Sequence, residues 1–262
     1  TNLIFSLSND ERPYAKDWFN HREFITRKLI KKPIMMIPYS GTIYGIALCL
    51  KEYLVKNNID VPWGTQTFKH YHYLAEMIQE SVANICPSST EVMSYLNKLG
   101  KCFTREDKQI EWLSPSNFLV KQSYKKTVSK KIKTQMGHST IRLTLLEDLN
   151  KVDKRRSIQS FPANFVHSMD AANVHLALEK AKSRGIDQVY TVHDCYGAVA
   201  GQIEDFISCA KESFIQIYKN NVLNDIHDQV SIQLDDPSKL PPIPKMGDFD
   251  IEEVMSAPYV FS

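Results

Sequence analysis

The heptapeptide that decides the fold is TVHDCYG, at residues 191–197. β-Branched and aromatic residues dominate on both sides of it, over residues 186–192 and 195–200, which predicts two short strands. His193 and Asp194 are then expected at a tight hairpin turn, because an aspartate tolerates turn geometry and projects its carboxylate away from the sheet. An isolated His-Asp pair is more commonly an ordinary turn without a function. The rest of the chain must therefore decide between a functional aspartate and a turn aspartate.

A second segment carries positive charge in a helical pattern. Arg27, Lys31, Met35 and Tyr39 are spaced by four residues, so on a helix they form one face, which we call the cationic stripe. Two cations one turn apart, followed by a methionine and a tyrosine, suit a nucleoside triphosphate with its phosphates at the cations and its sugar beyond. Alternatively, the stripe is a solvated basic face that ends in a core tyrosine. Pro33 predicts a kink or a later helix start.

Taken together, the two segments resemble the single-subunit, bacteriophage and mitochondrial type of DNA-directed RNA polymerase. The cationic stripe is similar to that family's fingers helix, and His193-Asp194 is similar to its second catalytic carboxylate hairpin. Two further blocks also resemble the family, FPANFVHSMD at residues 161–170 and the aromatic end PYVFS at residues 258–262. The polymerases encoded by mitochondrial linear plasmids look like the nearest relatives. Ser40 stands where the family more often has glycine.

The resemblance implies a mostly helical α+β fold, the fingers and C-terminal palm of a right-hand polymerase with an antiparallel catalytic hairpin. Residues 1–166 would form the fingers region with the nucleotide-binding helix, and residues 167–262 the palm with the catalytic hairpin and the C-terminal tail. In this family the first catalytic aspartate precedes the fingers helix. The chain is therefore expected to be the C-terminal part of a longer polypeptide, whose missing N-terminal part is a partner, and to be inactive alone.

The resemblance also implies the reaction, which is DNA-templated RNA synthesis by nucleotidyl transfer from ribonucleoside triphosphates. Asp194 would be a catalytic ligand of Mg²⁺, since two metal ions about 4 Å apart can hold the attacking and leaving oxygens of such a transfer. Arg27 and Lys31 would neutralise the triphosphate, and Lys31 is the better candidate to protonate the departing pyrophosphate. Tyr39 would lie beside the ribose.

Two histidines are expected to contact nucleic acid. His193 would support the hairpin or the primer end, and His167 matches a family position that contacts the minor groove near the active site. A histidine near a helix start with no partner is the alternative for His167. The implied partners are the DNA template, the nascent RNA and ribonucleoside triphosphates. The expected location is the mitochondrion, or an intracellular site for a viral or plasmid-encoded enzyme.

The composition is that of a globular protein without a membrane partner. The 262 residues are 43% hydrophobic and 24% charged, and no apolar run approaches the roughly 18 residues that span a bilayer. The net charge of +2 means that any nucleic-acid surface must be local. The five cysteines are scattered without a CxxC pair, which favours reduced thiols.

Two other functions compete with an RNA polymerase. An A-family DNA polymerase also shows Arg, Lys and Tyr at this spacing with a His-Asp hairpin. That family typically has Phe where this chain has Met35, and Glu where this chain has Cys195. The RNA polymerases typically show Ser at the latter position, and Cys is its near isostere. The other competitor is a non-catalytic nucleic-acid-binding module, or a polymerase remnant kept for its basic surface.

The remaining pattern predicts helices at residues 44–58, 68–85, 88–99, 168–184, 203–217 and 222–233. Ser168 is expected to cap its helix, and Gly100 and Gly185 are expected to end theirs. A hairpin is expected over residues 110–124. A shortened hairpin is expected from a strand at 141–146, a charged tip at 151–156 and a return at 158–161. A basic cluster contains Lys125, Lys126, Lys130, Lys131, Lys133 and Arg142. It would attract the phosphates of a nucleic acid, or alternatively form a solvated face without a partner.

Overall fold

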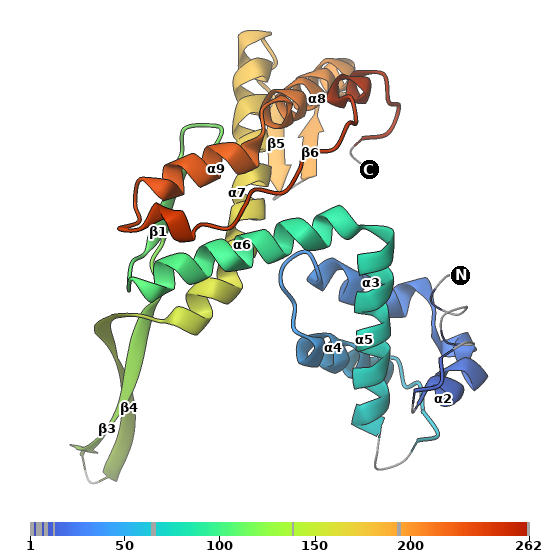
Figure 1. Cartoon of the computed structure of the whole chain (residues 1–262), viewed down its shortest axis with the longest axis vertical. Helices are drawn as coiled ribbons and strands as arrows, with labels where there is room; N and C mark the ends of the chain where they lie inside the picture. Colours follow the sequence, from blue (N-terminus) through green and yellow to red (C-terminus); the bar gives the residue numbers. More distant parts are fainter. Residues whose placement is uncertain are drawn as a thin grey trace. The chain divides into compact units, whose positions relative to one another are not determined.

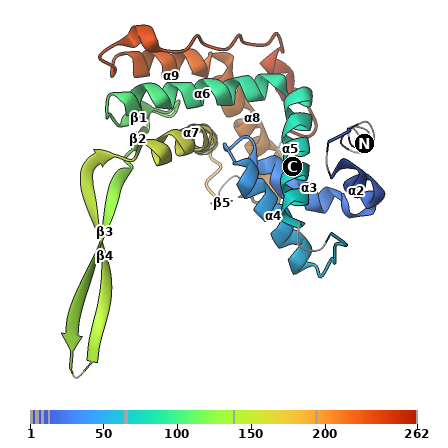
Figure 2. The ribbon, with the colours of Figure 1, turned by 60° about the horizontal axis from the view of Figure 1, so that its bottom comes forward.

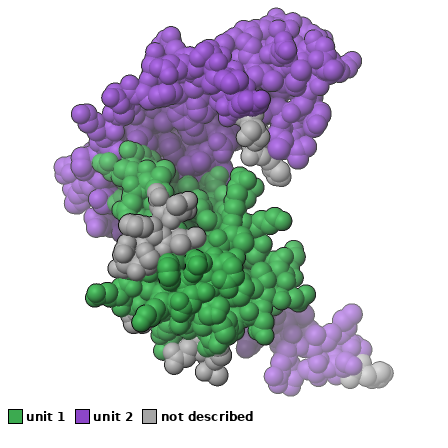
Figure 3. Space-filling model, turned by 90° about the vertical axis from the view of Figure 1, so that its right-hand side faces the viewer, with its two compact units in different colours: residues 1–94 green, residues 95–262 purple. Residues whose placement is uncertain are grey.

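The computed structural model describes residues 3, 7, 10–12, 14–63, 67–137, 139–192 and 195–260. It divides into two compact units, residues 1–94 and 95–262, which Figure 3 colours separately. Each unit is mostly helical, and the strands of the second form small antiparallel hairpins (Figure 1). This confirms the mostly helical α+β fold class. Among the described residues, no helix is both long and apolar enough to cross a membrane.

Unit 1 is a group of helices around an apolar core. Its elements are α2 (Ala15–Asn20), η1 (Arg22–Phe24), α3 (Arg27–Met36), α4 (Ile43–Lys56), α5 (Thr67–Ile85) and the start of α6 (Pro87–Arg105). The predicted helices at 44–58 and 68–85 are confirmed. Their apolar stripes bury Leu50, Leu54, Leu74 and Ile78 against Trp18, which is fully buried. Burying side chains of this size contributes about 1.5–3 kcal/mol each, so the core holds α3 and α4 in place.

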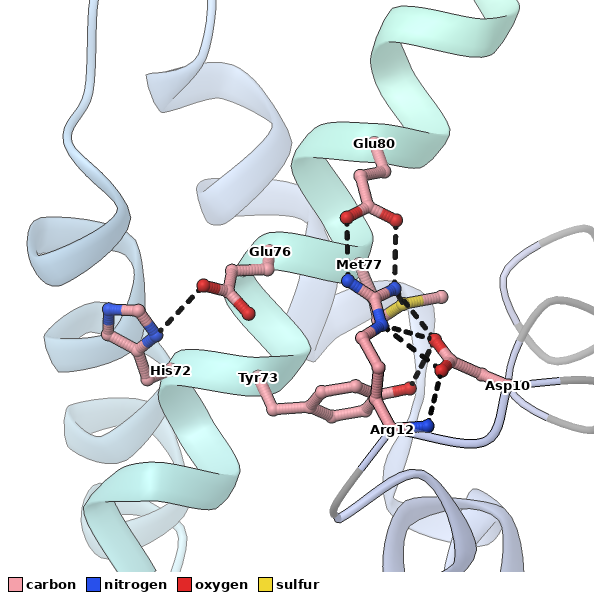
Figure 4. A network of polar contacts seen from close by, with 7 residues as sticks. All are labelled: Asp10, Arg12, His72, Tyr73, Glu76, Met77 and Glu80. Carbon is pink, nitrogen blue, oxygen red and sulfur yellow. Dashed lines mark hydrogen bonds and ion pairs between the residues drawn. The ribbon is translucent and has the colours of Figure 1, made fainter.

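A polar network attaches the chain before α2 to α5 (Figure 4). The guanidinium of Arg12 donates to both carboxylate oxygens of Glu80 at 2.7 and 2.9 Å, and to Asp10 at 2.7 to 3.1 Å. The hydroxyl of Tyr73 also donates to Asp10, at 3.0 Å. The hydrogen bonds from Arg12 lower the pKa of Asp10 from 3.8 to about 2. The charged form of Asp10 is therefore part of the folded state.

We expect an Asp10→Asn variant to be less stable than the parent chain by about 1 kcal/mol near neutral pH. Because the folded pKa of Asp10 is depressed, its contribution is present above the unfolded value near 4 and is lost as the pH falls toward 2. Urea unfolding followed by tryptophan fluorescence measures this, since Trp18 and Trp63 lie in unit 1. The difference in the free energy of unfolding between the parent chain and Asp10→Asn should become smaller below pH 4. A difference that is equally large at pH 2.5, or equally large for exposed Asp60→Asn, would contradict the assignment.

Unit 2 places helices beside three separate two-stranded sheets. The strands pair as β1 (Ile110–Leu113) with β2 (Leu119–Gln122), β3 (Lys125–Met136) with β4 (Ser139–Val152), and β5 (Val189–Val192) with β6 (Cys195–Ala198). The helices are the rest of α6, α7 (Lys154–Ser183), α8 (Ile203–Lys219) and α9 (Val222–Ser231), with short turns η3 (Ala200–Gln202), η4 (Pro237–Lys239) and η5 (Ile251–Met255). The predicted hairpin at 110–124 and the predicted helices after residue 203 are confirmed.

Gln229 of α9 and Gln233, in the turn that follows α9, cover the free edge of β1. The amide of Gln229 accepts from the backbone N–H of Leu113 at 2.7 Å and donates to its carbonyl at 3.3 Å. Gln233, one turn later, makes the same pair of bonds with Glu111 at 3.3 and 2.6 Å. Alternate residues of an edge strand expose their backbone groups on one side, so two amides four residues apart can pair with them. The short β1–β2 sheet is thereby fixed to α9.

The prediction for residues 141–161 is wrong. Instead of a short strand, a charged tip and a return, residues 125–152 form one long hairpin of β3 and β4 that extends away from the helices of unit 2 (Figure 2). In β3, Val128, Lys130 and Ile132 share one face, and Lys131 and Lys133 share the other. The lysines do not alternate strictly with apolar residues along β3, so the local pattern does not mark this strand clearly.

The prediction that Ser168 caps a helix is also wrong. Helix α7 starts at Lys154, where the Asp153 side chain accepts from the N–H of Arg156 at 3.0 Å. Ser168 lies inside this helix, accepts from the indole N–H of Trp112 at 3.0 Å and donates to the Phe165 carbonyl at 2.7 Å. The serine therefore satisfies a buried tryptophan instead of a helix end.

The two predicted glycine stops have different outcomes. Gly185 follows α7 with a φ of +75°, as expected for a helix stop. Gly100 does not end its helix, because α6 continues to Arg105. A Cβ atom at Gly100 would lie 3.6 Å from the Cα atom of Ile158, an ordinary van der Waals distance, so the contact between α6 and α7 does not require a glycine. Cys102 and Phe103 in the next turn are buried, and this packing holds the helix past Gly100.

Candidate active site

Helix α3 carries Arg27, Lys31 and Met35 of the cationic stripe on its exposed face, and Tyr39 lies in the turn after the helix. Thr26 caps it by accepting from the N–H of Leu29 at 3.3 Å, and Leu29 and Pro33 face the core. Pro33 is therefore inside the helix, which starts no later than predicted. Met35 is 55% exposed and Tyr39 is 37% exposed, and the side chains of Arg27 and Lys31 are exposed as well. The stripe is thus available to a ligand, whereas the alternative of a core tyrosine does not hold.

The turn after α3 determines where Tyr39 is held. Helix α3 ends at Met36, and the N–H of Gly41 donates back to the Met36 carbonyl at 2.8 Å. The N–H of Ser40 donates to the Ile37 carbonyl at 3.0 Å, and Ser40 has a φ of +59°. These two bonds around a left-handed residue form a Schellman motif. Glycine adopts a positive φ without steric cost, so a glycine would also suit the position of Ser40.

We expect Gly41→Ala to destabilise this turn. A Cβ atom there would lie 2.7 Å from the Met36 carbonyl oxygen and 2.9 Å from its Cβ, so backbone must move. The cost should be about 1–3 kcal/mol, which lowers the midpoint of thermal unfolding by several degrees. Gly45→Ala is the matched control, because its nearest contact is 3.3 Å to the Thr42 hydroxyl. Equal midpoints for the two variants would show that the turn tolerates a side chain.

The catalytic hairpin expected from the sequence is confirmed in its strands. β5 and β6 are antiparallel, with Val192 opposite Cys195, so the chain joins the strands through His193 and Asp194. Both of these predicted site residues lie outside the described residues. Cys195, directly after Asp194, is exposed. The position of the Asp194 carboxylate thus stays a prediction, while the strands that carry it are defined.

Helices α7 and α8 support this hairpin from one side. A small core contains Ala181, Ile186, Phe206 and Cys209, and Val189 and Ala198 from the strands pack against it. Arg184 at the end of α7 forms an ion pair with Glu212 of α8 at 2.7 Å. The hydrogen bond from Arg184 lowers the pKa of Glu212. As predicted, α8 packs under the hairpin, so helix packing locates the two strands.

His167 lies on α7, on the exposed side of a continuous helix. It is not beside a helix start, as the sequence analysis had expected, because the true cap is Asp153. An exposed position on a rigid helix is compatible with a nucleic-acid contact, which stays a prediction.

The described residues contain no cluster of three or more His, Cys, Asp or Glu side chains that could hold a metal ion. Asp194 is outside that search, and one carboxylate does not complete a magnesium site, because Mg²⁺ prefers about six oxygen ligands. Any magnesium at the hairpin would need phosphate oxygens or further carboxylates in addition to Asp194. The stripe lies in unit 1 and the hairpin in unit 2, so their convergence stays a prediction.

The β3–β4 hairpin adds a surface that the sequence analysis described only as a cluster. Lys133 pairs with Arg142 and Lys131 pairs with Thr144 across the strands, so these three cations share one face. On the other face Ile132 pairs with Leu143, and both are more than 40% exposed. The sequence signal for this arrangement is a short alternation of polar and apolar residues over residues 140–145. We call the side with Lys131, Lys133 and Arg142 the basic face.

A family profile described as DNA-dependent RNA polymerase matches residues 6–238. The chain belongs to the DNA-dependent RNA polymerase family. This confirms the resemblance inferred from the cationic stripe and the hairpin, both of which lie inside the matched range, and it favours this family over the A-family DNA polymerases.

Individual polymerases show the same relationship. DNA-directed RNA polymerase 1, mitochondrial, of Nicotiana sylvestris is 27% identical over 238 residues, which are 91% of this chain and 23% of that protein. DNA-directed RNA polymerase 2A of Nicotiana tabacum is 27% identical over 239 residues, 70% of its length. The DNA-directed RNA polymerase of Pseudomonas phage phiKMV is 26% identical over 231 residues, 28% of its length. The chain thus spans about a quarter of the first and the last of these relatives.

Proposed function

We propose that the chain takes part in DNA-templated RNA synthesis by supplying the nucleotide-binding helix and one catalytic carboxylate of a single-subunit polymerase. The observation that carries this proposal is the family match over residues 6–238, which includes the cationic stripe and the His193-Asp194 turn. In this assignment unit 1 contains part of the fingers and the β5–β6 hairpin belongs to the palm. The functional boundary near residue 166 is part of the proposal and differs from the boundary between the compact units.

The cationic stripe would bind the ribonucleoside triphosphate. Arg27 and Lys31 are one helical turn apart on an exposed face, which suits adjacent phosphates. Lys31 would also give a proton to the pyrophosphate as it leaves. Tyr39, held by the Schellman turn, would lie beside the ribose and favour ribonucleotides.

Asp194 would bind magnesium at the turn between β5 and β6. When bound, the metal ion supplies positive charge at the phosphate that is transferred. Asp194 contributes a single carboxylate, and the described residues hold no acidic cluster, so additional ligands are required. We therefore propose that this chain does not catalyse by itself.

Nucleic acid would contact several exposed groups of unit 2. His193 would support the hairpin or the primer end, and His167 would contact nucleic acid from α7. The basic face of the β3–β4 hairpin would bind phosphates of the DNA template or the nascent RNA, because clustered cations release counterions there. Mitochondrial relatives and a phage relative make a mitochondrial or a virus- or plasmid-encoded enzyme the proposed setting.

Extension of a primed template with only ribonucleotides or only deoxynucleotides tests the function. A polymerase that carries this chain should extend with ribonucleotides and Mg²⁺, whereas the chain alone should not. Extension with deoxynucleotides only would favour the DNA polymerase alternative. Binding of DNA with no synthesis under either condition would favour a non-catalytic remnant.

A further inference from the structure

The inference concerns what holds strand β6 in place, and it depends on the proposed function of Asp194. β6 begins at Cys195, directly after Asp194, so any contact that fixes β6 also restricts the point from which the carboxylate is presented. Tyr196 is the second residue of this strand and is partly buried, whereas its neighbour Cys195 is exposed. Tyr196 is therefore the described side chain nearest to Asp194 in sequence that packs toward the helices.

Two contacts fix Tyr196 against α7 and α8. The side-chain amide of Asn173 on α7 donates to the Tyr196 hydroxyl at 3.1 Å. The Tyr196 ring lies edge-on to the ring of Phe206 on α8, with centroids 5.8 Å apart. Because the hydrogen bond acts at the far end of a rigid ring, it restricts rotation of the side chain as well as its depth. The strand is thus attached to both helices through one residue.

Burial of the Asn173 amide on α7 has a free-energy cost. Asn173 is 6% exposed, and its amide oxygen is buried with no hydrogen-bond partner among the described residues. A buried polar group with an unmet bond is destabilising, so an amide at this position has a cost that a leucine would not have. The bond from the Asn173 amide to the Tyr196 hydroxyl offsets part of that cost.

A cavity beside β6 increases the contribution of the Asn173–Tyr196 hydrogen bond to the position of the strand. A cavity of about 610 Å³ is lined by Cys195 and Tyr196 of β6, Asn173 of α7, and Ile207 and Phe214 of α8, among others. Close packing normally fixes a strand on its helices, but beside this cavity β6 has fewer neighbours to pack against. Tyr196 is the residue of this end of β6 that packs on the small core, where Val189 and Ala198 of the hairpin also pack.

We propose that Asn173 and Tyr196 are positioning residues, which hold the β6 end of the hairpin so that Asp194 is presented in one orientation. Neither side chain needs to contact the substrate. Their effect should appear in the rate of nucleotide addition and in the magnesium requirement, because both depend on where the carboxylate lies. The affinity for ribonucleotides should not change, because the cationic stripe is on a different unit.

Tyr196→Phe and Asn173→Leu test the proposal in a polymerase that carries this chain. Each variant should slow single-nucleotide addition about tenfold and raise the Mg²⁺ concentration for half-maximal rate, with an unchanged KM for ribonucleotides. The double variant should be no slower than the slower single variant, because both remove the same bond. Tyr190→Phe is the matched control: Tyr190 is on the neighbouring strand, 67% exposed, and should behave as wild type.

Three results would overturn the proposal. They are a Tyr196→Phe rate within twofold of wild type, an equal loss in Tyr190→Phe, and rate losses that multiply in the double variant. Asp194→Asn, measured in parallel, distinguishes failure of the positioning role from failure of the proposed function. If Asp194→Asn is inactive while Tyr196→Phe is normal, only the positioning role fails; if Asp194→Asn is active, the proposed function itself fails.

Discussion

Replacement of Asp194 by asparagine is expected to reduce RNA synthesis at least about 1000-fold in a polymerase that carries this chain. Asparagine keeps the size of the side chain but removes the charge that would hold magnesium, so binding of DNA and ribonucleotides should persist. Pre-steady-state addition of one ribonucleotide to a primer measures the rate directly. A loss of this size is about 4 kcal/mol of transition-state stabilisation.

Asp187→Asn is the matched control for this experiment. Asp187 is an exposed aspartate in the loop before β5, and its replacement should leave the rate unchanged. Synthesis by Asp194→Asn within tenfold of wild type would reject a catalytic role for the turn. Asp194 would then be an ordinary turn residue, the alternative that the heptapeptide alone leaves open.

Replacement of Lys31 by glutamine is expected to lower the rate of nucleotide addition about 100- to 1000-fold. The side chain is exposed on α3, so the change should have little effect on stability. If Lys31 transfers a proton to pyrophosphate, the loss should appear in kcat and in its pH profile, as well as in KM. Single-turnover kinetics between pH 6 and 9 distinguish these effects.

Two further variants interpret that result. Lys31→Arg keeps the positive charge but does not release a proton readily, so it should restore most of the ribonucleotide affinity without restoring kcat. Lys28→Gln removes an exposed charge that lies beside the stripe but not on it. This control variant should leave the rate of nucleotide addition nearly unchanged. A Lys31→Arg variant with normal kcat would show that Lys31 acts through charge alone.

The parts of the fold that follow from local pattern were predictable. Apolar residues at helical spacing predicted α4, α5 and α8, and the β-branched runs beside His193-Asp194 predicted the two strands of the β5–β6 hairpin. Arg27, Lys31 and Met35 of the cationic stripe lie on one exposed helix face as predicted, whereas Tyr39 lies in the turn after the helix. In each case the signal is a period within one segment, which depends on neighbouring residues and little on the rest of the chain.

The errors occurred where distant segments decide the structure. Ser168 reads as a helix cap, but it binds the buried indole of Trp112, 56 residues away in sequence. Gly100 reads as a helix stop, but α6 continues past it because Cys102 and Phe103 in the next turn are buried. Propensity contributes only a few tenths to one kcal/mol per residue, so a buried hydrogen bond or the burial of apolar side chains outweighs it.

Taken alone, the sequence determined the family, the chemistry of the groups that could bind a nucleotide, and the segments that carry them. The tertiary structure decided which residues support those groups: a left-handed Ser40 that turns the chain after Tyr39, and an Asn173 that reaches Tyr196 from 23 residues away. The physical reason is that side-chain chemistry and short-range periodicity are local properties. The support of a site, by contrast, depends on contacts between segments that meet only when the chain has folded.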